Sequence, residues 1–276
     1  MGQRMALNLV NHQVPLTVYN RSAESRQVLA EAGAQVADSF SEAVRGAEVV
    51  FSMLSTPEAV EQVMLGEVLS ALPAGALWVD CSTVDPEFSR RCAKTAQAHD
   101  LRFLGAPVAG TKPHAEQAQL SFFVGGAARD LEKVRPLLEM MGQKVLHLGE
   151  QGQGAAFKML VNSLLAQSML VFSEAVHLGE ALGLDRDFLL DTLPQLPVTA
   201  PFTQAKAERI RQGNYDAQFP LEWMHKDLHL ASLCGYQTGQ TLPMANLAKE
   251  LYAQANAQGL GREDFAAIFK ALIHHS

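Results

Sequence analysis

The first half of the chain alternates short apolar, β-branched runs with longer amphipathic stretches. Short runs with a two-residue period predict strands, whereas apolar residues that recur every three or four positions predict helices. The expected strands span residues 16–19, 49–54, 76–80, 102–104, 121–124 and 145–148. The expected helices span residues 23–32, 57–65, 86–98 and 131–141. Strands that alternate with helices predict βαβ units and a mainly parallel sheet.

The second half shows only the helical pattern. Residues 155–182 keep it without interruption, over a length sufficient to join two domains. Shorter helices, separated by Pro and Gly, are expected at 185–193, 203–212, 222–234, 242–258 and 262–273. We therefore expect an α/β domain in residues 1–150 and an all-helical domain in residues 151–276, which the helix 155–182 enters.

Composition agrees with two packed domains. The chain has 276 residues, of which 48% are hydrophobic and 18% charged, and this excludes intrinsic disorder. Its net charge of −7 argues against a broad surface for nucleic acid or acidic membranes. We therefore expect neither nucleic acid nor a membrane as a partner.

Sequence features of location point to the cytoplasm. The first residues contain no uninterrupted apolar region, so we expect no signal peptide. The most apolar stretch, 159–176, is interrupted by Asn, Ser, Gln and Glu, which favours a buried helix over a membrane span. The odd number of cysteines, Cys81, Cys92 and Cys234, predicts reduced thiols. The histidines show neither HExxH nor HxH spacing, so no metal site is expected.

Ligands of a parallel sheet bind at the carboxyl ends of its strands, here residues 20–22, 54–56 and 81–83. After the second strand of a dinucleotide-binding fold, an acidic residue favours NAD, whereas Arg accommodates the 2′-phosphate of NADP. Asn20, Arg21 and Ser22 occupy this position and include no carboxylate. The alternative is a solvated loop in which Ser22 caps the next helix.

Glycine-rich residues 152–154 precede the long helix, and Lys158 and Asn162 follow four positions apart. This spacing places both side chains on one helix face, and the exposed N–H groups at a helix start suit a carboxylate. The alternative is an ordinary amphipathic helix with a surface lysine. Lys226 and Asp227 form a third candidate pair, although such pairs on helices are usually only solvated ions.

Five motifs resemble those of the β-hydroxyacid dehydrogenase family, which includes 3-hydroxyisobutyrate dehydrogenase, tartronate semialdehyde reductase and glyoxylate/succinic semialdehyde reductase. The motifs are, in chain order, MGQRMALNL at 1–9, VDCSTVDP at 79–86, APVAGT at 106–111, GQGAAFKMLVN at 152–162 and KDLHLA at 226–231. Each motif alone is weak. Five in the family's order, covering nearly the whole chain, are specific.

The resemblance implies a Rossmann-type domain followed by an all-α domain, and an NADPH-dependent reductase of a small aldehyde or keto acid that bears a carboxylate. It implies that Lys158 is the general acid and that Asn162 holds the substrate and orients Lys158. The cofactor-binding residues it implies are Gly2, Met5, Asn20, Arg21, Ser22, Leu54, Ser55, Thr83 and Lys226. The substrate-binding residues it implies are Ala109, Gly110, Thr111, Phe219 and Asp227. A homodimer or homotetramer is also expected by resemblance.

Within the family, residues 110–120 and 219–221 resemble the glyoxylate/succinic semialdehyde reductase branch. Ala109, however, stands where the family usually has Ser, and Ala118 replaces a usual Gly. Loss of one hydrogen bond to a charged group costs about 1.5–3 kcal/mol. The substrate can therefore differ from that of the branch, and its identity stays open.

The first nine residues look like the second half of the family's GLGxMGxxMAxNL cofactor motif. By this resemblance, one strand and a tight turn, about ten residues, are expected before Met1. Either the start codon is assigned too late, or the chain has lost its pyrophosphate site. The second case leaves a non-catalytic, dimeric scaffold as the alternative function. An imine reductase is a weaker alternative, because those enzymes usually lack a lysine at position 158.

Overall fold

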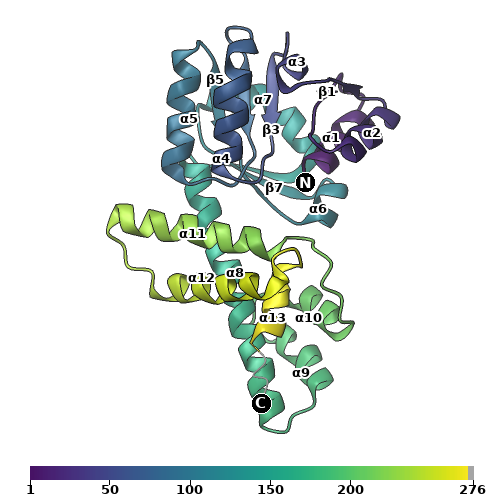
Figure 1. Cartoon of the computed structure of the whole chain (residues 1–276), viewed down its shortest axis with the longest axis vertical. Helices are drawn as coiled ribbons and strands as arrows, with labels where there is room; N and C mark the ends of the chain where they lie inside the picture. Colours follow the sequence, from purple (N-terminus) through teal and green to yellow (C-terminus); the bar gives the residue numbers. More distant parts are fainter. Residues whose placement is uncertain (273–276) are drawn as a thin grey trace. The chain divides into compact units, whose positions relative to one another are not determined.

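The computed structural model describes residues 1–272 and divides into two compact units, Met1–Lys158 and Met159–Ser276 (Figure 1). The first unit alternates strands and helices, as the periodicity predicts. Its elements are α1 (Gly2–Asn11), β1 (Thr17–Val18), α2 (Ala23–Glu31), β2 (Gln35–Val36), α3 (Phe40–Ala43), β3 (Val49–Ser52), α4 (Pro57–Val60), the π-helix η1 (Glu61–Val68), the 3₁₀ turn η2 (Leu69–Ala71), β4 (Leu77–Asp80), α5 (Pro86–Ala98), β5 (Arg102–Gly105), β6 (Val108–Ala109), α6 (Lys112–Glu116), β7 (Leu120–Val124), α7 (Ala128–Met141) and β8 (Gly142–His147).

The strands form three small sheets. β1 pairs with β2, and β3, β4 and β5 pair in that order, all parallel. In the third sheet β7 pairs with β8 in parallel and with β6 antiparallel. An isolated bridge between Gly105 and Gly125 joins the ends of β5 and β7. Within residues 1–272, β1 and β3 belong to separate sheets. The expected mainly parallel α/β arrangement is confirmed.

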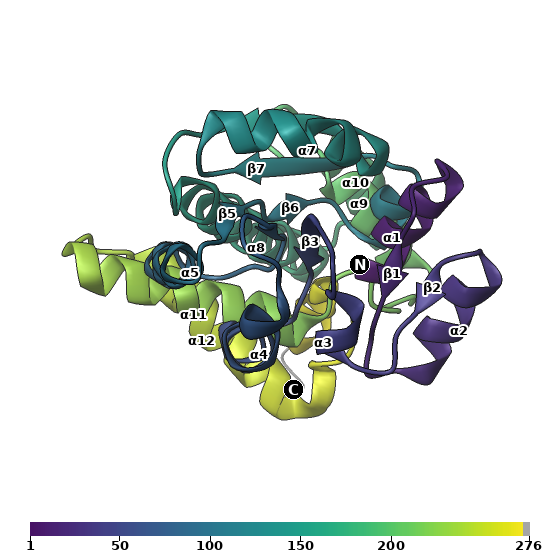
Figure 2. The same cartoon turned by 90° about the horizontal axis from the view of Figure 1, so that it is seen from above.

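Helices cover both faces of the β3–β4–β5 sheet (Figure 2). Side chains alternate along β4, so Trp78 packs with Phe88 of α5 and Phe103, while Leu77 packs with Leu138 of α7 on the other face. In Figure 2, α4 and α5 lie on one side of these strands and α7 lies on the other. The two cores hold the sheet from both sides, and its carboxyl edge carries the candidate residues.

The second unit is helical, as predicted. α8 (Gln153–Ala181) begins in the first unit and continues into the second. The elements that follow are α9 (Arg186–Thr192), the 3₁₀ turn η3 (Leu193–Gln195), α10 (Thr203–Arg211), α11 (Leu221–Thr238), α12 (Pro243–Ala255), the π-helix η4 (Asn256–Leu260), the 3₁₀ turn η5 (Phe265–Ala267) and α13 (Ile268–Ala271). Their core gathers buried residues of α8, α11, α12 and the C-terminal segment around Tyr252 and Phe265.

Several helix boundaries differ from the sequence prediction. α7 begins at Ala128 rather than at 131, and α4 and α12 pass into π-helices after Val60 and Ala255. The helix expected at 222–234 continues through Gly235 to Thr238. Gly235 does not end the helix but permits close packing, since a Cβ there would lie 2.8 Å from Leu242 Cδ1. The helix expected at 262–273 is wrong in its first half. Asp264 caps a 3₁₀ turn with its side chain, and α13 begins only at Ile268. Residue 273 lies outside the described residues.

By length and composition α8 could cross a membrane, but core helices meet the same criteria. Of its most apolar window, 44% is buried inside the structure. Ala166, Met169, Phe172 and Val176 of α8 all belong to the core of the second unit. The helix thus forms part of a packed core, in agreement with the polar residues that interrupt its sequence.

The junction of α7 and β8 gives a direct test of the packing. Gly142 lies opposite Leu120 at an irregularity between β7 and β8, and a Cβ on it would lie 2.4 Å from the Leu120 carbonyl oxygen. We expect Gly142→Ala to lower the free energy of unfolding by at least about 2 kcal/mol, because the strands must separate. Urea denaturation measures this change.

The matched control is Gly66→Ala in η1, where the nearest atom to a Cβ is the Glu61 carbonyl oxygen at 3.8 Å. We expect this variant to be as stable as the wild type or more stable, because Ala restricts the unfolded chain. Equal stability of the two variants would contradict the close contact at Gly142.

Candidate functional site

Candidate residues of the first unit gather at the carboxyl edge of β3 and β4. The parallel register places Ser52 beside Asp80 at the ends of these strands. The backbone N–H of Leu54 donates to Ser82 Oγ at 2.9 Å, and this bond joins the segments that follow the two strands. Leu54 therefore lies beside Ser82, the residue before Thr83, and Ser55 is exposed at this edge.

Beneath this edge lies a buried polar network that the sequence analysis missed. Trp78 Nε1 donates to Ser52 Oγ, and Ser52 Oγ donates to Asp80 Oδ1, both at 2.7 Å. The backbone N–H of Ser82 donates to the same carboxylate oxygen at 3.2 Å. Asp80 is 2% exposed. Because a buried carboxylate needs such donors, the network fixes both segments. Its sequence signal is a polar residue at the end of each apolar strand.

The same burial makes Cys81 chemically quiet. Desolvation, and secondarily the charge of Asp80, raise the pKa of the Cys81 thiol well above its usual range. Desolvation also raises the pKa of Cys92. Both side chains therefore remain neutral thiols with the properties of small apolar groups. Within residues 1–272, no disulfide joins the cysteines, and no group of three or more His, Cys, Asp or Glu side chains could hold a metal ion.

Asn20, Arg21 and Ser22 lie exposed between β1 and α2. Ser22 occupies the N-cap position of α2, but its side chain makes no capping hydrogen bond. The Ser22 hydroxyl therefore does not cap α2, as the alternative interpretation of a solvated loop requires. One turn into α2, the Arg26 guanidinium lies 5.3 Å from the centre of the Tyr19 ring. The loop and the first turn of α2 thus present two cations and a hydroxyl at the end of a parallel strand.

Gly2 and Met5 lie on α1. Gly2 is its first residue, and a Cβ there would make only an ordinary contact, 3.5 Å from Met53 Cβ. Packing against the described residues therefore does not require a glycine at this position. Met5 is 4% exposed and belongs to the core with Leu9 and Leu77. Its side chain therefore faces the core.

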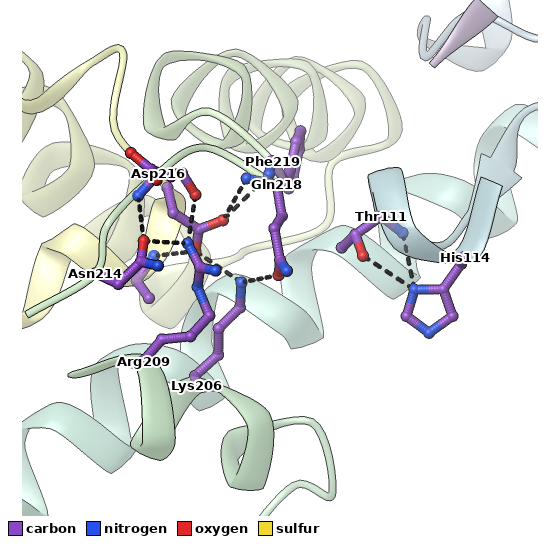
Figure 3. A network of polar contacts seen from close by, with 10 residues as sticks. Thr111, His114, Lys206, Arg209, Asn214, Asp216, Gln218 and Phe219 are labelled. Carbon is purple, nitrogen blue, oxygen red and sulfur yellow. Dashed lines mark hydrogen bonds and ion pairs between the residues drawn. The ribbon is translucent and has the colours of Figure 1, made fainter. Parts of the chain in front are cut away.

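The loop 109–111 follows the antiparallel pairing of β6 and β7. Gly110 has φ +127°, and a Cβ on it would lie 2.8 Å from Leu120 Cδ2, so the loop requires glycine here. Thr111 starts α6 in a capping box with His114. The Thr111 backbone N–H donates to His114 Nδ1 at 3.2 Å, and the Thr111 hydroxyl lies 2.9 Å from the same nitrogen (Figure 3). The Thr111 hydroxyl is thus already engaged, and Ala109 supplies none.

The start of α8 approaches the β-strands closely. A Cβ on Gly154 would lie 2.1 Å from the Phe123 carbonyl oxygen, and one on Gly125 would lie 2.9 Å from the Gly154 nitrogen. Gly152 has φ +87° and approaches the Pro86 carbonyl oxygen in the same way. These glycines let the first turn of α8 rest directly on backbone. They set the origin of the helix that carries Lys158 and Asn162.

Lys158 and Asn162 are both buried, with exposed fractions of 8% and 2%. This excludes the interpretation of Lys158 as an ordinary surface lysine. Asn162 Nδ2 donates to Asp227 Oδ2, and Lys226 Nζ lies 2.8 Å from Asp227 Oδ1. Asp227 is 3% exposed, and its carboxylate is paired with the Lys226 ammonium and hydrogen-bonded by the Asn162 amide. The carboxylate can only accept, which fixes the orientation of the Asn162 amide.

Two family models match the chain in succession. Residues 1–149 match the NAD binding domain of 6-phosphogluconate dehydrogenase. Residues 152–272 match the NAD-binding domain of NADP-dependent 3-hydroxyisobutyrate dehydrogenase.

Curated proteins and solved structures agree with these models. The chain is 35% identical over 274 residues to glyoxylate/succinic semialdehyde reductase 2 of Arabidopsis thaliana, covering 99% of this chain and 76% of that protein. It superimposes on Mycobacterium tuberculosis 3-hydroxyisobutyrate dehydrogenase with L-serine at a TM-score of 0.89 and 31% identity, covering 99% and 96% of the two chains. Psf3 in complex with NADP⁺ and 2-OPP gives a TM-score of 0.90 at 25% identity, covering 99% and 97%.

Proposed function

Because the chain belongs to the 3-hydroxyisobutyrate dehydrogenase family, and is thus an NAD(P)-dependent oxidoreductase of small hydroxy acids, we propose that it uses NADPH to reduce a small aldehyde or keto acid, reversibly. The observation that carries this proposal is the pair Lys158 and Asn162. Both are buried on one face of α8, and Asp227 holds the Asn162 amide. In domain terms, residues 1–150 would bind the cofactor and residues 151–276 would form the helical substrate domain.

The chemistry divides between the cofactor and the side chains. Bound NADPH would supply a hydride to the carbonyl carbon of the substrate. Lys158 would donate a proton to the developing alkoxide oxygen as general acid, and would take it back in the reverse direction. Asn162 would hold the substrate and orient Lys158, because Asp227 accepts from its Nδ2 and leaves Oδ1 as an acceptor.

The proposed substrate-binding residues are Ala109, Gly110 and Thr111 in the first unit, and Phe219 and Asp227 in the second. Ala109 supplies no hydroxyl, and the Thr111 hydroxyl is engaged with His114. The Thr111 N–H is also engaged with His114, so a substrate carboxylate would rely on the backbone N–H of Gly110 in this loop. Glyoxylate and succinic semialdehyde are the first substrates to try, because the Arabidopsis relative carries them in its name. Tartronate semialdehyde, a substrate in the wider family, is the third.

The preference for NADPH over NADH rests on the loop after β1. The Arg21 guanidinium can hold the 2′-phosphate by two parallel hydrogen bonds, and the uncommitted Ser22 hydroxyl can donate a third. Nothing acidic occupies residues 20–22 to bind a ribose 2′-hydroxyl. Psf3, which shares the fold over nearly its whole length, is itself in complex with NADP⁺. The other proposed cofactor-binding residues are Gly2, Met5, Asn20, Leu54, Ser55 and Thr83 in the first unit, and Lys226 in the second.

We propose a cytoplasmic location from the cysteines, since a cytoplasmic protein keeps its thiols reduced. A non-catalytic scaffold is not favoured, because the similar reductase and dehydrogenase are named as enzymes.

A homodimer or homotetramer is supported by one exposed face of α8. Leu164, Val171 and Leu178 lie seven residues apart, and therefore on one face, with exposed fractions of 67%, 58% and 61%. An apolar stripe of this kind marks a protein–protein contact.

Replacement of the proposed acid tests the reaction. We expect Lys158→Ala to lower kcat for NADPH-dependent reduction of the best of the three substrates by about 100-fold or more, the usual contribution of a general acid. Steady-state kinetics measures kcat, and fluorescence titration with NADPH shows whether the variant still binds the cofactor. Lys133→Ala, an exposed lysine on α7, is the control and should retain full activity. A loss below about tenfold, with the fold intact, would rule out Lys158 as the acid.

Cofactor preference is tested at Arg21. We expect Arg21→Ala to raise the KM for NADPH about tenfold, because a charge-assisted hydrogen bond to the 2′-phosphate is lost. The KM for NADH should stay unchanged. Arg129→Ala, an arginine that is 84% exposed on α7, is the control. An unaltered ratio of NADPH to NADH efficiency would contradict the proposed role of Arg21.

The exposed face of α8 is tested by charge. We expect the wild type to be an oligomer in light scattering, and Leu164→Glu to lower its mass in solution, because a buried unpaired carboxylate disfavours the contact. Val28→Glu on α2, where the apolar side chain is 36% exposed, should leave the mass unchanged. A monomeric wild type, or an unchanged mass in Leu164→Glu, would contradict an interface through this face.

A further inference from the structure

The loop between α10 and α11, residues 212–220, has neither helical nor extended structure of its own, apart from one bridge at Pro220. Its backbone is joined instead to the segment 261–265. Asp264 and Phe265 donate their N–H groups to the carbonyl oxygens of Tyr215 and Phe219, both at 2.8 Å. In the other direction, Leu221 N–H donates to the Glu263 carbonyl oxygen at 2.8 Å. Backbone hydrogen bonds thus hold the loop and the start of α11 against residues 263–265.

The Asp264 carboxylate lies at the centre of these hydrogen bonds. Asp264 Oδ2 accepts from the backbone N–H groups of Gln218 and Phe219, at 3.0 and 3.1 Å. Its Oδ1 accepts from the Ala266 N–H at 3.1 Å and from Lys206 Nζ at 2.7 Å. Asp264 is fully buried. All four of these donors converge on one side chain, so the loop cannot shift without leaving a buried charge unsatisfied.

The positive partner is equally buried. Lys206 on α10 is 4% exposed, and its ammonium group also donates to Gln218 Oε1 at 3.2 Å and lies 4.7 Å from the centre of the Phe265 ring. Figure 3 shows the Lys206 side chain of α10 pointing toward the Gln218 side chain of the loop. Burial lowers the pKa of Lys206, and the charge of Asp264 acts against this shift.

A buried ion pair contributes little net stability, because desolvation offsets most of its Coulomb energy. In some proteins such a pair instead selects one arrangement among several. An outer set of contacts already ties the same loop: Arg209 donates to Asn214 Oδ1 at 3.0 Å and to the Asp216 carbonyl oxygen at 2.5 Å (Figure 3). The Lys206–Asp264 pair acts instead on Gln218 and Phe219, at the entry to α11.

The position of this entry matters for the proposed site. Phe219 precedes Pro220, the N-cap of α11, and Asp227 follows seven residues later, about 10 Å along the helix axis. Asp227 accepts from Asn162, so a shift of α11 along its axis changes the orientation of the Asn162 amide. A displacement of the first turn of α11 also displaces its later turns, because a hydrogen-bonded helix moves as a rigid body.

We propose that Lys206 and Asp264 are positioning residues that set substrate selectivity, by fixing Phe219 and the first two turns of α11 without contacting the substrate. This inference rests on the proposed function, because it assigns Phe219 and Asp227 to the substrate side of that reaction.

The test uses Lys206→Met, which removes the cation and keeps the three backbone donors to Asp264. We expect the KM for glyoxylate to rise about tenfold, with a smaller change in kcat, since a displaced binding group weakens orientation first. The ratio of kcat/KM for succinic semialdehyde to that for glyoxylate should also change. The Kd of NADPH should change less than the KM for glyoxylate, because Lys226 is the one proposed cofactor residue that lies on α11.

Arg262→Met is the matched control. Arg262 is 85% exposed and pairs with Glu222 in the first turn of α11, so this variant removes an ion pair from the same segment without touching the buried pair. It should retain the wild-type KM and selectivity. Gln218→Leu removes only the second partner of Lys206 and should show the same changes at smaller size. If Lys206→Met does not fold, the KM and selectivity of Gln218→Leu provide the test instead.

A variant that folds and keeps both the wild-type KM and the wild-type selectivity, while its melting temperature falls, would show that the pair is only structural and overturn the inference. Equal changes in Arg262→Met would overturn it as well, because any loosening of the segment would then suffice. A wild type that reduces none of the three substrates with NADPH would instead overturn the proposed function.

Discussion

A buried carboxylate must be surrounded by donors, and three such groups organise this protein. Asp80 gathers Ser52 and the Ser82 N–H at the edge of the β3–β4–β5 sheet. Asp227 joins Lys226 to Asn162, and Asp264 joins Lys206 to two backbone N–H groups of the loop before α11. Because a buried charge without donors costs several kcal/mol, each arrangement tolerates little displacement. Of the residues that we assign to the reaction, Leu54 bonds to Ser82 beside the first arrangement, Asn162 belongs to the second and Phe219 to the third.

Close contact between backbones supplies the second constraint. The first turn of α8 can rest on β7 only because Gly125 and Gly154 carry no side chain. Lys158 lies one turn further along the same helix, so these glycines contribute to its position along α8. Rigid scaffolds of this kind suit proton transfer, where a misplacement of about 1 Å can cost a large factor in rate.

Periodicity predicted the long regular elements well and the short ones poorly. α5 and α8 extend over enough turns for the apolar pattern to repeat, and their boundaries lie within two residues of the expected ones. β2, β6, α3 and α6 were missed, because two to five residues are too few for any period to appear. Gly235 does not end α11, since its role is to contact Leu242, and a sequence pattern does not distinguish a glycine that stops a helix from one that permits packing.

By itself, the sequence determined the α/β and helical halves, the five motifs and the residue types at the candidate site. Those features are local, and local periodicity and spacing report them directly. Only the tertiary structure decided that Ser52 bonds to Asp80, that Asn162 bonds to Asp227 across 65 positions, and that Lys206 pairs with Asp264 across 58. Such pairings depend on which faces pack together, and many partners of suitable chemistry are available to each residue along the chain. Burial then makes the chosen pairing strict, because a charge removed from water has few alternatives.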